Sequence, residues 1–427
     1  MTSATATDAN PAGTGEVMTA DGVPLRISLA RARRRSRNRA LLLVAPLFLF
    51  VLITFFIPIL SMLFRSVENQ IVGETLPHTV EALQQWDESG GDLPPEEVYA
   101  ALVEDLRIAN ETKTAGKVGR RMNYEKSGFA SLFRTTARRI KRIEAPYKET
   151  LIKAKKDWGE LETWQVLKRE SDAYTLSYYL AAVDFSYTPT GEVLKLPDDR
   201  SLYVGLFWRT IWMSLLITVL CLILAYPISY LLSTLPVKTS NLLMILVLLP
   251  FWTSLLVRTS AWIALLQKEG VINDLLVWVG LIGDEHRLTM IHNATGTIVA
   301  MTHVLLPFMV LPLYSVMKTI PPSYMRAARS LGATPFMAFV RVYMPNTVPG
   351  IGAGALLVFI ISIGYYITPA LVGGQSGTLI SNFIAYHLSI SLNWGLAAAL
   401  GTILLVLVLA LYILYDKIVG IDNMKMG

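Results

Sequence analysis

Long stretches without a single charged side chain constrain the fold of this chain more than any other feature. Leu41 to Phe64 and Thr210 to Leu235 contain no Asp, Glu, Lys or Arg. A helix crosses a bilayer core of about 30 Å with roughly 20 apolar residues. Because backbone polar groups in a bilayer must be paired within their own segment, such stretches are helical. We therefore predict an all-α integral membrane protein.

Four further segments meet the same length criterion, so we predict six transmembrane helices. Only 16% of the 427 residues are charged, against about 25% in soluble proteins. The third segment contains Pro250 and Arg258 and is expected to be long or kinked. The predicted spans cover residues 41–64, 210–235, 239–267, 294–317, 347–371 and 393–415.

Charge is concentrated between the first two spans, where residues 65–200 hold 43 of the 70 charged side chains. We predict a large, mainly helical insert here, because segments such as Glu96 to Ala109 and Gly128 to Lys156 have helical spacing. The basic residues at 138–142 are expected to form a solvated helix face, with contact to anionic headgroups or to a binding protein as the alternative. Three tryptophans are expected to anchor a small core rather than a ligand cage: Trp86, Trp158 and Trp164.

Basic residues ahead of the first span predict the orientation, because Lys and Arg near helix ends stay on the cytoplasmic side. These residues are Arg26, Arg31, Arg33, Arg34, Arg35, Arg37 and Arg39. A cleaved signal peptide is disfavoured because the apolar stretch is longer than a typical h-region. With six spans, both termini are expected in the cytoplasm and the insert in the periplasm. The predicted layout is a tail at 1–40, a first helix at 41–64, an insert at 65–200, a core at 203–415 with a cytoplasmic loop at 318–346, and a tail at 416–427.

The predicted cytoplasmic loop has the pattern of a short helix, a glycine turn and another short helix. Ser323 is a suitable N-cap for the first helix, and Gly332 suits the left-handed residue that ends it. Thr334 is expected to cap the second helix, with Pro335 in its first turn. Ala327 and Ala328 would leave a small surface that another protein can approach closely. From these residues alone, a docking element and an amphipathic helix lying on the membrane remain equally open.

The spacing of this loop resembles the EAA motif of inner-membrane permeases of ATP-binding-cassette importers. That motif is Glu-Ala-Ala, three residues, Gly, nine residues, then Ile-x-Leu-Pro. The corresponding positions here are Arg326, Ala327, Ala328, Gly332, Val342, Met344 and Pro345. Arg326 replaces the Glu of the motif, so a contact made by that carboxylate would have to be replaced or inverted in sign.

Other segments are similar to the spermidine/putrescine-type branch of these permeases, and the resemblance covers residues 41–64 and 203–415. The segments are Leu249 to Trp262, Gly270 to Asn273, Leu306 to Tyr314 and Ile367 to Gly374. The resemblance implies the type I importer permease fold and a location in the bacterial inner membrane. It also implies three partners, namely an ATP-binding-cassette ATPase, a second permease subunit in a heterodimer and a periplasmic solute-binding protein. The insert is not covered.

The same resemblance implies that the chain is not an enzyme and binds no cofactor of its own. The sequence has no Gly-x-x-x-x-Gly-Lys-Ser/Thr phosphate loop, so ATP and Mg²⁺ would be handled by the partner ATPase. No nucleic-acid partner is expected, since the N-terminal arginines lie beside a membrane span. The loop at 323–345 would transmit ATPase closure to the pore.

The translocated solute is the least determined part of the prediction. A polyamine such as spermidine or putrescine is the first expectation, but the six spans contain no carboxylate to attract a polycation. An anionic or zwitterionic solute, such as an amino acid or organic acid, remains the alternative. For the class of protein, the alternatives are a secondary transporter and a sensor or assembly protein. Cation–π contacts are worth about 0.5–2 kcal/mol each, which makes aromatic residues candidates for the pathway. The candidates are Trp252, Arg258, Trp262, Tyr365, Tyr366 and Trp394, whereas His303 is expected to be a packing residue.

Overall fold

The computed structural model describes residues 25–419 and divides the chain into two compact units, residues 1–62 and 63–427. The outer parts of both predicted tails, residues 1–24 and 420–427, lie outside the described residues. Helices make up most of the described structure, with one small hairpin. The fold is therefore helical, as the sequence predicts.

The first unit is a nearly continuous helix that contains the first predicted span. It consists of α1 (Leu25–Val51), the π-turn η1 (Leu52–Phe56) and α2 (Ile57–Arg65). The last residues of α2, from Leu63 on, belong to the second unit. The helix begins well before residue 41, because the Arg- and Ala-rich segment ahead of the apolar stretch has high helix propensity. The π-turn precedes Pro58, which has no N–H for the carbonyl of Thr54 and so disturbs the regular α-helical bonding.

The insert opens the second unit and is built from short helices and one hairpin. Its helices are α3 (Gln70–Thr75), α4 (Pro77–Gln84), η2 (Glu88–Gly90), α5 (Glu96–Glu111), α6 (Ala115–Asn123), α7 (Phe129–Arg139), η3 (Ile140–Arg142), α8 (Tyr147–Ala154), η4 (Lys156–Gly159), α9 (Leu161–Arg169) and α10 (Ser177–Ala182). Strands β1 (Phe185–Tyr187) and β2 (Val193–Lys195) pair antiparallel. The helix predicted after Pro94-Pro95 is α5, whereas the segment 128–156 is divided among α7, η3 and α8.

The insert has its own apolar core, and the three predicted tryptophans are buried in it. Trp158 stands at the centre, where its ring packs against Phe133 and Trp164. Its indole N–H donates to Oγ1 of Thr136 at 2.9 Å, and its carbonyl accepts hydrogen bonds from Tyr99 and Trp164. Buried aromatic side chains with satisfied polar atoms give a small domain much of its stability, which confirms their predicted role as core anchors.

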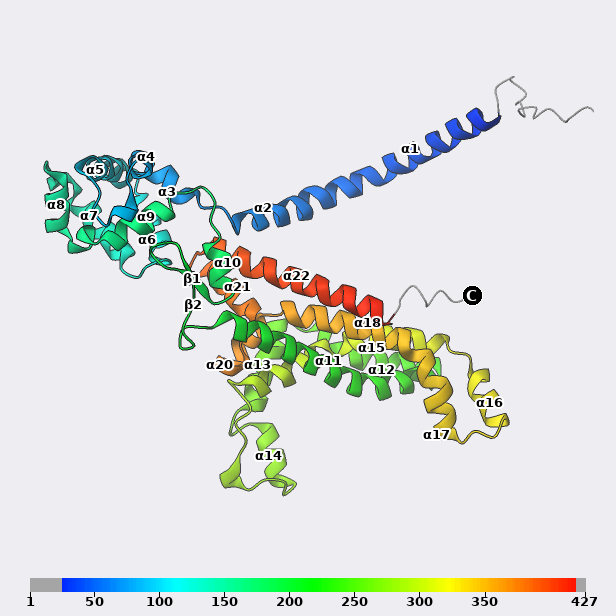
Figure 1. Cartoon of the computed structure of the whole chain (residues 1–427). Coiled ribbons are helices and arrows are strands. Elements are labelled where there is room, and N and C mark those ends of the chain that lie inside the picture. The colour runs from blue at the N-terminus through cyan, green and yellow to red at the C-terminus, as the bar shows by residue number, and fades with distance from the viewer. Residues whose placement is uncertain (1–24, 420–427) are drawn as a thin grey trace, which may run out of the picture. The chain divides into compact units, whose positions relative to one another are not determined.

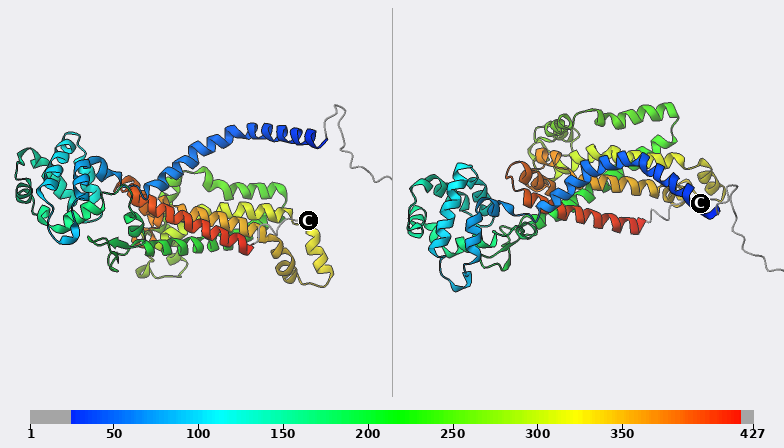
Figure 2. Two further views of the ribbon diagram at one scale, coloured as in Figure 1. Left: turned by 45° about the horizontal axis from the view of Figure 1, so that its top comes forward. Right: turned by 90° about the horizontal axis from the view of Figure 1, so that it is seen from above.

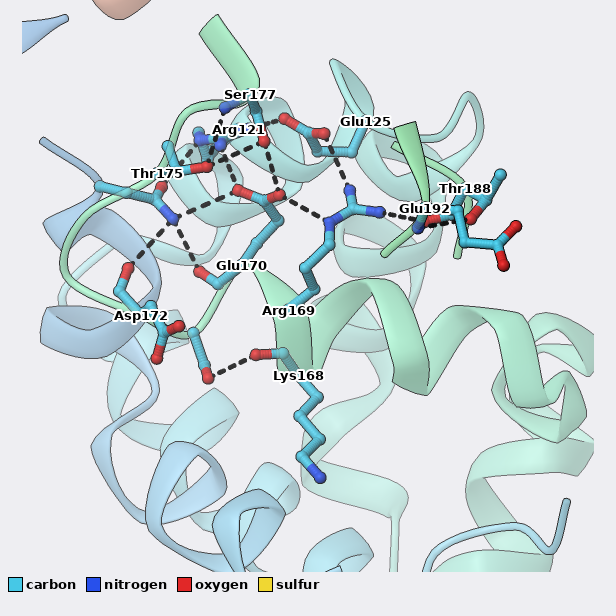
Figure 3. A network of polar contacts seen from close by, with 12 residues as sticks. Arg121, Glu125, Lys168, Arg169, Glu170, Asp172, Thr175, Ser177, Thr188 and Glu192 are labelled. Carbon is cyan, nitrogen blue, oxygen red and sulfur yellow. Dashed lines mark hydrogen bonds and ion pairs between the residues drawn. The ribbon is translucent and has the colours of Figure 1, made fainter. Parts of the chain in front are cut away.

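A buried ionic network connects α6 and α9 (Figure 3). Arg121 contacts the carboxylates of Glu125 and Glu170, and Arg169 contacts the same two carboxylates. Burial and the neighbouring Glu170 raise the pKa of Glu125. Two arginines and two glutamates balance in charge, so the network is stable only while all four members are present.

The same network joins the two ends of the insert. The side chain of Asn69, at the entry to the insert, accepts from Nε of Arg121 at 2.9 Å. Ser177, where the chain returns toward the core, donates to Oε1 of Glu170 at 2.9 Å. The insert is therefore a closed structure whose entry and exit are held next to each other.

The permease core follows the insert. Its elements are α11 (Tyr203–Thr234), α12 (Val237–Leu248), η5 (Leu249–Trp252), α13 (Leu255–Leu266), α14 (Val271–Trp278), η6 (Asp284–His286), α15 (Ala294–Thr319), α16 (Pro322–Ser330), α17 (Pro335–Ala338), η7 (Phe339–Tyr343), α18 (Met344–Gly364), α19 (Ile367–Val372), α20 (Gly374–Gly377), α21 (Ile380–Ser389) and α22 (Trp394–Val419). Helices α11, α15 and α18 pack side by side, and α22 lies along α18 (Figures 1 and 2). Several of these helices are long and apolar.

Five helices of the described chain are long and apolar enough to cross a membrane, and a bent pair supplies a sixth if it counts as one span. The pair consists of residues 237–252 and 255–278, which meet at 96°. Pro250 lies at this break, so the kink predicted for the third span is present and is much sharper than a simple bend. The fifth span ends at Gly364 rather than at residue 371, since α19 forms a separate short helix.

Glycines on α18 allow it to approach α15 closely. A Cβ atom on Gly350 would lie 3.1 Å from the Cα of Leu313, and one on Gly354 would lie 2.7 Å from Sδ of Met309. Small residues at such positions permit the short helix separations common in membrane proteins. The glycine pattern of α18 therefore serves helix packing.

Candidate functional site

The loop between α15 and α18 has the helix, glycine turn and cap that its sequence indicates. The amide of Ala333 donates to the carbonyl of Ala328 at 3.1 Å, and that of Gly332 to Arg329 at 3.0 Å. These two bonds form a Schellman motif, and Gly332 has the φ of +88° that the motif requires. Thr334 then caps the next turn by accepting from the amide of Met337.

Two details of the predicted loop are wrong. Helix α16 starts behind Pro321, with Pro322 in its first turn, and Ser323 makes no capping bond. Pro322 fits the first helical position because its missing N–H is not needed there. The second short helix does not end before the membrane span, because α17, η7 and α18 form one helix from Pro335 to Gly364. The π-turn η7 lies directly ahead of Pro345 and absorbs the hydrogen bond that this proline cannot donate.

Helix α16 presents its side chains outward, and none of its residues is buried. Arg326 and Ala327 are exposed, while Ala328 is half-buried. Leu331 is 89% exposed and Phe336 is 77% exposed, which is unusual for large apolar residues outside a membrane span. The turn therefore displays an apolar tip next to arginine side chains, a surface suited to contact with another protein.

An aromatic cluster fastens the base of this loop to α11. The ring of Phe339 packs against Tyr226, Tyr230 and Tyr343, with centroids 5.3–6.1 Å apart. Of the other motif residues, Val342 is half-buried beside the cluster, whereas Met344 and Pro345 are exposed. Movement of the loop would therefore be passed to α11 and α18 together.

The loop lies at the opposite end of α11 from the insert. Near the C-terminus of α11, Ser229 donates to the carbonyl of Val310, and Nζ of Lys318 donates to the carbonyl of Ser233. The insert joins the N-terminus of α11 at Tyr203. Figure 1 shows α16 and α17 at one end of the core helices and α20 and α21 at the other. A helix of 32 residues is about 48 Å long, enough to separate the two sides of a membrane.

Three of the six predicted pathway residues come together between α13, α15 and the end of α18. The indole N–H of Trp262 donates to Nδ1 of His303 at 3.1 Å. The charge of Arg258 acts on both His303 and Tyr365. The Nε of Arg258 is buried and has no hydrogen-bond partner among the described residues. A buried cation with an unused donor can orient a polar solute.

The other three predicted pathway residues lie elsewhere. Trp252 is 83% exposed at the break of the bent pair, and Tyr366 is also exposed. Trp394 lies at the start of α22, where Cζ of Arg65 is 5.2 Å from the centroid of its ring. His303 belongs to the cluster but was predicted only to pack, because an isolated histidine in an apolar helix carries no partner signal in the sequence. The contact between His303 and Trp262 depends on how α13 and α15 pack together.

The described residues contain no group of three or more His, Cys, Asp or Glu side chains that could hold a metal ion. The single cysteine, Cys221, is buried in α11, where its thiol contacts the carbonyl of Thr302.

Comparison with known proteins identifies the core. The family model of the binding-protein-dependent transport system inner membrane component matches residues 220–419. The spermidine/putrescine transport system permease protein PotB of Haemophilus influenzae is 36% identical over 222 residues, which are 51% of this chain and 77% of that protein. The chain belongs to this permease family. PotB of Escherichia coli is 34% identical over 224 residues, covering 52% of this chain and 81% of that protein.

Another Escherichia coli relative is the inner membrane ABC transporter permease protein YdcU. It is 32% identical over 254 residues, which are 56% of this chain and 79% of that protein. The chain is thus a permease subunit of an ATP-binding-cassette importer in the inner membrane, and the resemblance stated from its motifs is confirmed. As a permease it is a transport component rather than an enzyme. The family match begins within α11, includes α16 and the later core helices, and leaves out the insert.

Proposed function

We propose that this permease subunit carries a polyamine, such as spermidine or putrescine, from a periplasmic binding protein to the cytoplasm. The support for the solute is the similarity to two PotB proteins, whose names state spermidine/putrescine transport. In this proposal a partner ATPase that binds ATP and Mg²⁺ docks on residues 323–345, and a second, different permease subunit completes the pathway. The observation that carries the docking role is the outward-facing α16 with its Schellman turn.

The proposed orientation follows from charge and geometry. Arg326, Arg329 and Arg341 lie around α16, and basic loops are retained in the cytoplasm. An ATPase also needs the cytoplasmic supply of ATP, so α16 and both termini are placed inside. Because the insert joins the far end of α11, it is placed in the periplasm, where the binding protein delivers solute.

The proposed mechanism is a two-state movement biased by the ATPase. Closure of the ATPase would push α16, and the Phe339 cluster would pass this displacement to α11 and α18. A ligand shifts such an equilibrium only by its differential affinity for the two states, and the coupling is reciprocal. The loaded binding protein would accordingly stimulate ATP hydrolysis from the other side of the membrane.

One observation favours a second candidate, an anionic or zwitterionic solute. Arg258 lies in the polar cluster with Trp262 and Tyr365 and has an unused donor. A cation at this place would attract a carboxylate and repel an ammonium group, since unit charges within a few ångströms interact strongly away from water. A secondary transporter is no longer a candidate, because the family is established.

The deciding experiment is solute-stimulated ATP hydrolysis by the reconstituted complex of both permeases, the ATPase and the binding protein. A panel of polyamines, amino acids and organic anions would be presented with the binding protein. Stimulation by polyamines alone supports the proposal. Stimulation by anions or amino acids alone replaces it with the second candidate, and wild-type ATPase activity that responds to no solute refutes both.

A further inference from the structure

A groove on the insert gathers four basic side chains. It lies between α6 and α7, beside the end of α5, and encloses about 550 Å³. Lys113, Arg120, Arg134 and Arg138 line it, and no Asp or Glu does. Among residues 25–419, which the structure describes, the side chains of these four make no hydrogen bond or ion pair.

The fold brings these cations together through a close helix crossing. A Cβ atom on Gly119 would lie 3.0 Å from the Cβ of Phe133 and 3.4 Å from the Cα of Ala130. The absence of that atom lets α6 and α7 approach, which places Arg120 and Arg134 on the two walls of one groove. Its floor consists of small residues such as Gly116 and Ala130, so a protruding side chain of another molecule can reach the cations.

Several other basic residues of the insert are paired with acidic side chains, unlike the four that line the groove. Arg121 and Arg169 are held by buried glutamates, and Lys126 contacts Glu160 and Glu162. What distinguishes the groove is that its lining gathers four cations and includes no acidic side chain. Clustered like charges repel one another and are stabilised by a complementary anionic surface.

The position of the groove indicates which partner supplies that surface. Arg120 also lines a second pocket of about 450 Å³, whose other wall is the turn at residues 391–395 of the permease core. The phenol of Tyr124 donates to the carbonyl of Ser391 across this junction at 2.7 Å. A protein seated on this end of the core would therefore extend directly onto the groove.

We propose that the groove between α6 and α7 binds acidic side chains of the solute-binding protein and guides its docking on the permease. The proposal rests on the proposed function, which places this end of the core in the periplasm. A bilayer is the less suitable occupant, because it presents a plane of headgroups to a recessed groove. Complementary charges of this kind mainly raise the association rate and depend on ionic strength.

The test uses the whole complex in nanodiscs of zwitterionic lipid. Two quantities are measured, the direct binding of loaded binding protein and the concentration of it that half-maximally stimulates ATP hydrolysis. The double variant Arg134→Glu/Arg138→Glu is expected to raise that concentration roughly tenfold or more at low salt. The maximal rate should stay unchanged, and the difference should shrink as salt is added.

Two further variants serve as controls. Lys141→Glu/Arg142→Glu makes the same change of charge on the same insert outside the groove, and should shift binding less than about twofold. Gly116→Leu fills the groove without changing charge, and a Cβ atom there meets no other atom within 4 Å. This variant should weaken binding while the insert stays folded, as judged by its resistance to proteolysis.

The possible outcomes separate this proposal from the proposed function. If wild type is stimulated but the groove variants bind the loaded protein normally, the groove proposal is overturned and import stands. It is likewise overturned if the control pair has the same effect, or if the effect appears only in discs containing anionic lipid, which would assign the groove to the membrane. If wild type is not stimulated by any loaded binding protein, both proposals fail.

Discussion

Replacing Gly332 by valine tests whether the turn after α16 is needed to dock the ATPase. Gly332 has φ of +88° and forms the left-handed residue of the Schellman motif. A β-branched residue held in this region costs about 1–3 kcal/mol. A Cβ atom at this position meets no other atom within 4 Å, so the cost is purely one of backbone conformation.

The magnitude follows from how little else fixes the loop. No residue of α16 is buried, so the strain can be relieved by giving up the docked geometry of the turn. With 1.4 kcal/mol for each factor of ten, a cost of about 2 kcal/mol lowers the population of that geometry roughly 30-fold. The apparent affinity for the ATPase should fall by the same factor, and transport should fall with it.

The assay is the concentration of ATPase needed to saturate permease in nanodiscs, measured beside solute uptake. Gly332→Asn is the matched control, because asparagine tolerates the left-handed region far better than valine. Membrane insertion and the amount of folded permease should be equal in all three proteins, since the turn makes no buried contact. If the Gly332→Val variant binds the ATPase and transports solute as well as the wild type, the docking role of this turn is refuted.

Three other changes have definite expected outcomes. Arg121→Met leaves Arg169 as the one remaining cation between two buried glutamates and should destabilise the insert by about 3–5 kcal/mol, seen as faster proteolysis of the insert while the core spans stay protected. The hydrogen bond with Asp105 raises the pKa of His78 above its usual 6.5, so the stabilisation is complete below pH 6.5 and is lost as pH rises through the raised pKa. His78→Gln should therefore remove this loss of thermal stability as the pH is raised above 6.5. Arg258→Gln should increase polyamine-stimulated ATPase activity if the solute is cationic and abolish stimulation if it is anionic, whereas equal activity with every solute would place Arg258 outside the pathway.

The parts of the fold that depend on local chemistry could be predicted from the sequence. Uncharged stretches located the spans, and the residues around Gly332 and Thr334 identified the turn and cap that the structure contains. Each of these depends on a few neighbouring residues, such as a glycine needed for positive φ. The break at Pro250 was predicted for the same reason, although its angle was not.

The remaining features depend on contacts between residues far apart in the chain. The fifth span was predicted to begin at residue 347, but the π-turn η7 lets the helix run through from Pro335. Trp394 was grouped with the pathway because it is aromatic, yet its ring contacts the guanidinium of Arg65. The partnership of His303 with Trp262 joins residues 41 positions apart, a distance at which sequence spacing carries no signal.

The continuity of the helix from Pro335 to Gly364 changes how the two candidate regions relate. The Phe339 cluster lies near its beginning, and Tyr365 is the residue that caps its end. Thirty residues of helix span about 45 Å, so one rigid element connects the exposed loop to the polar cluster around Arg258. A loop joined by a separate short helix could move without disturbing that cluster. Here the loop and Tyr365 belong to the same helix, so we expect a displacement of the loop along the helix axis to move Tyr365 as well.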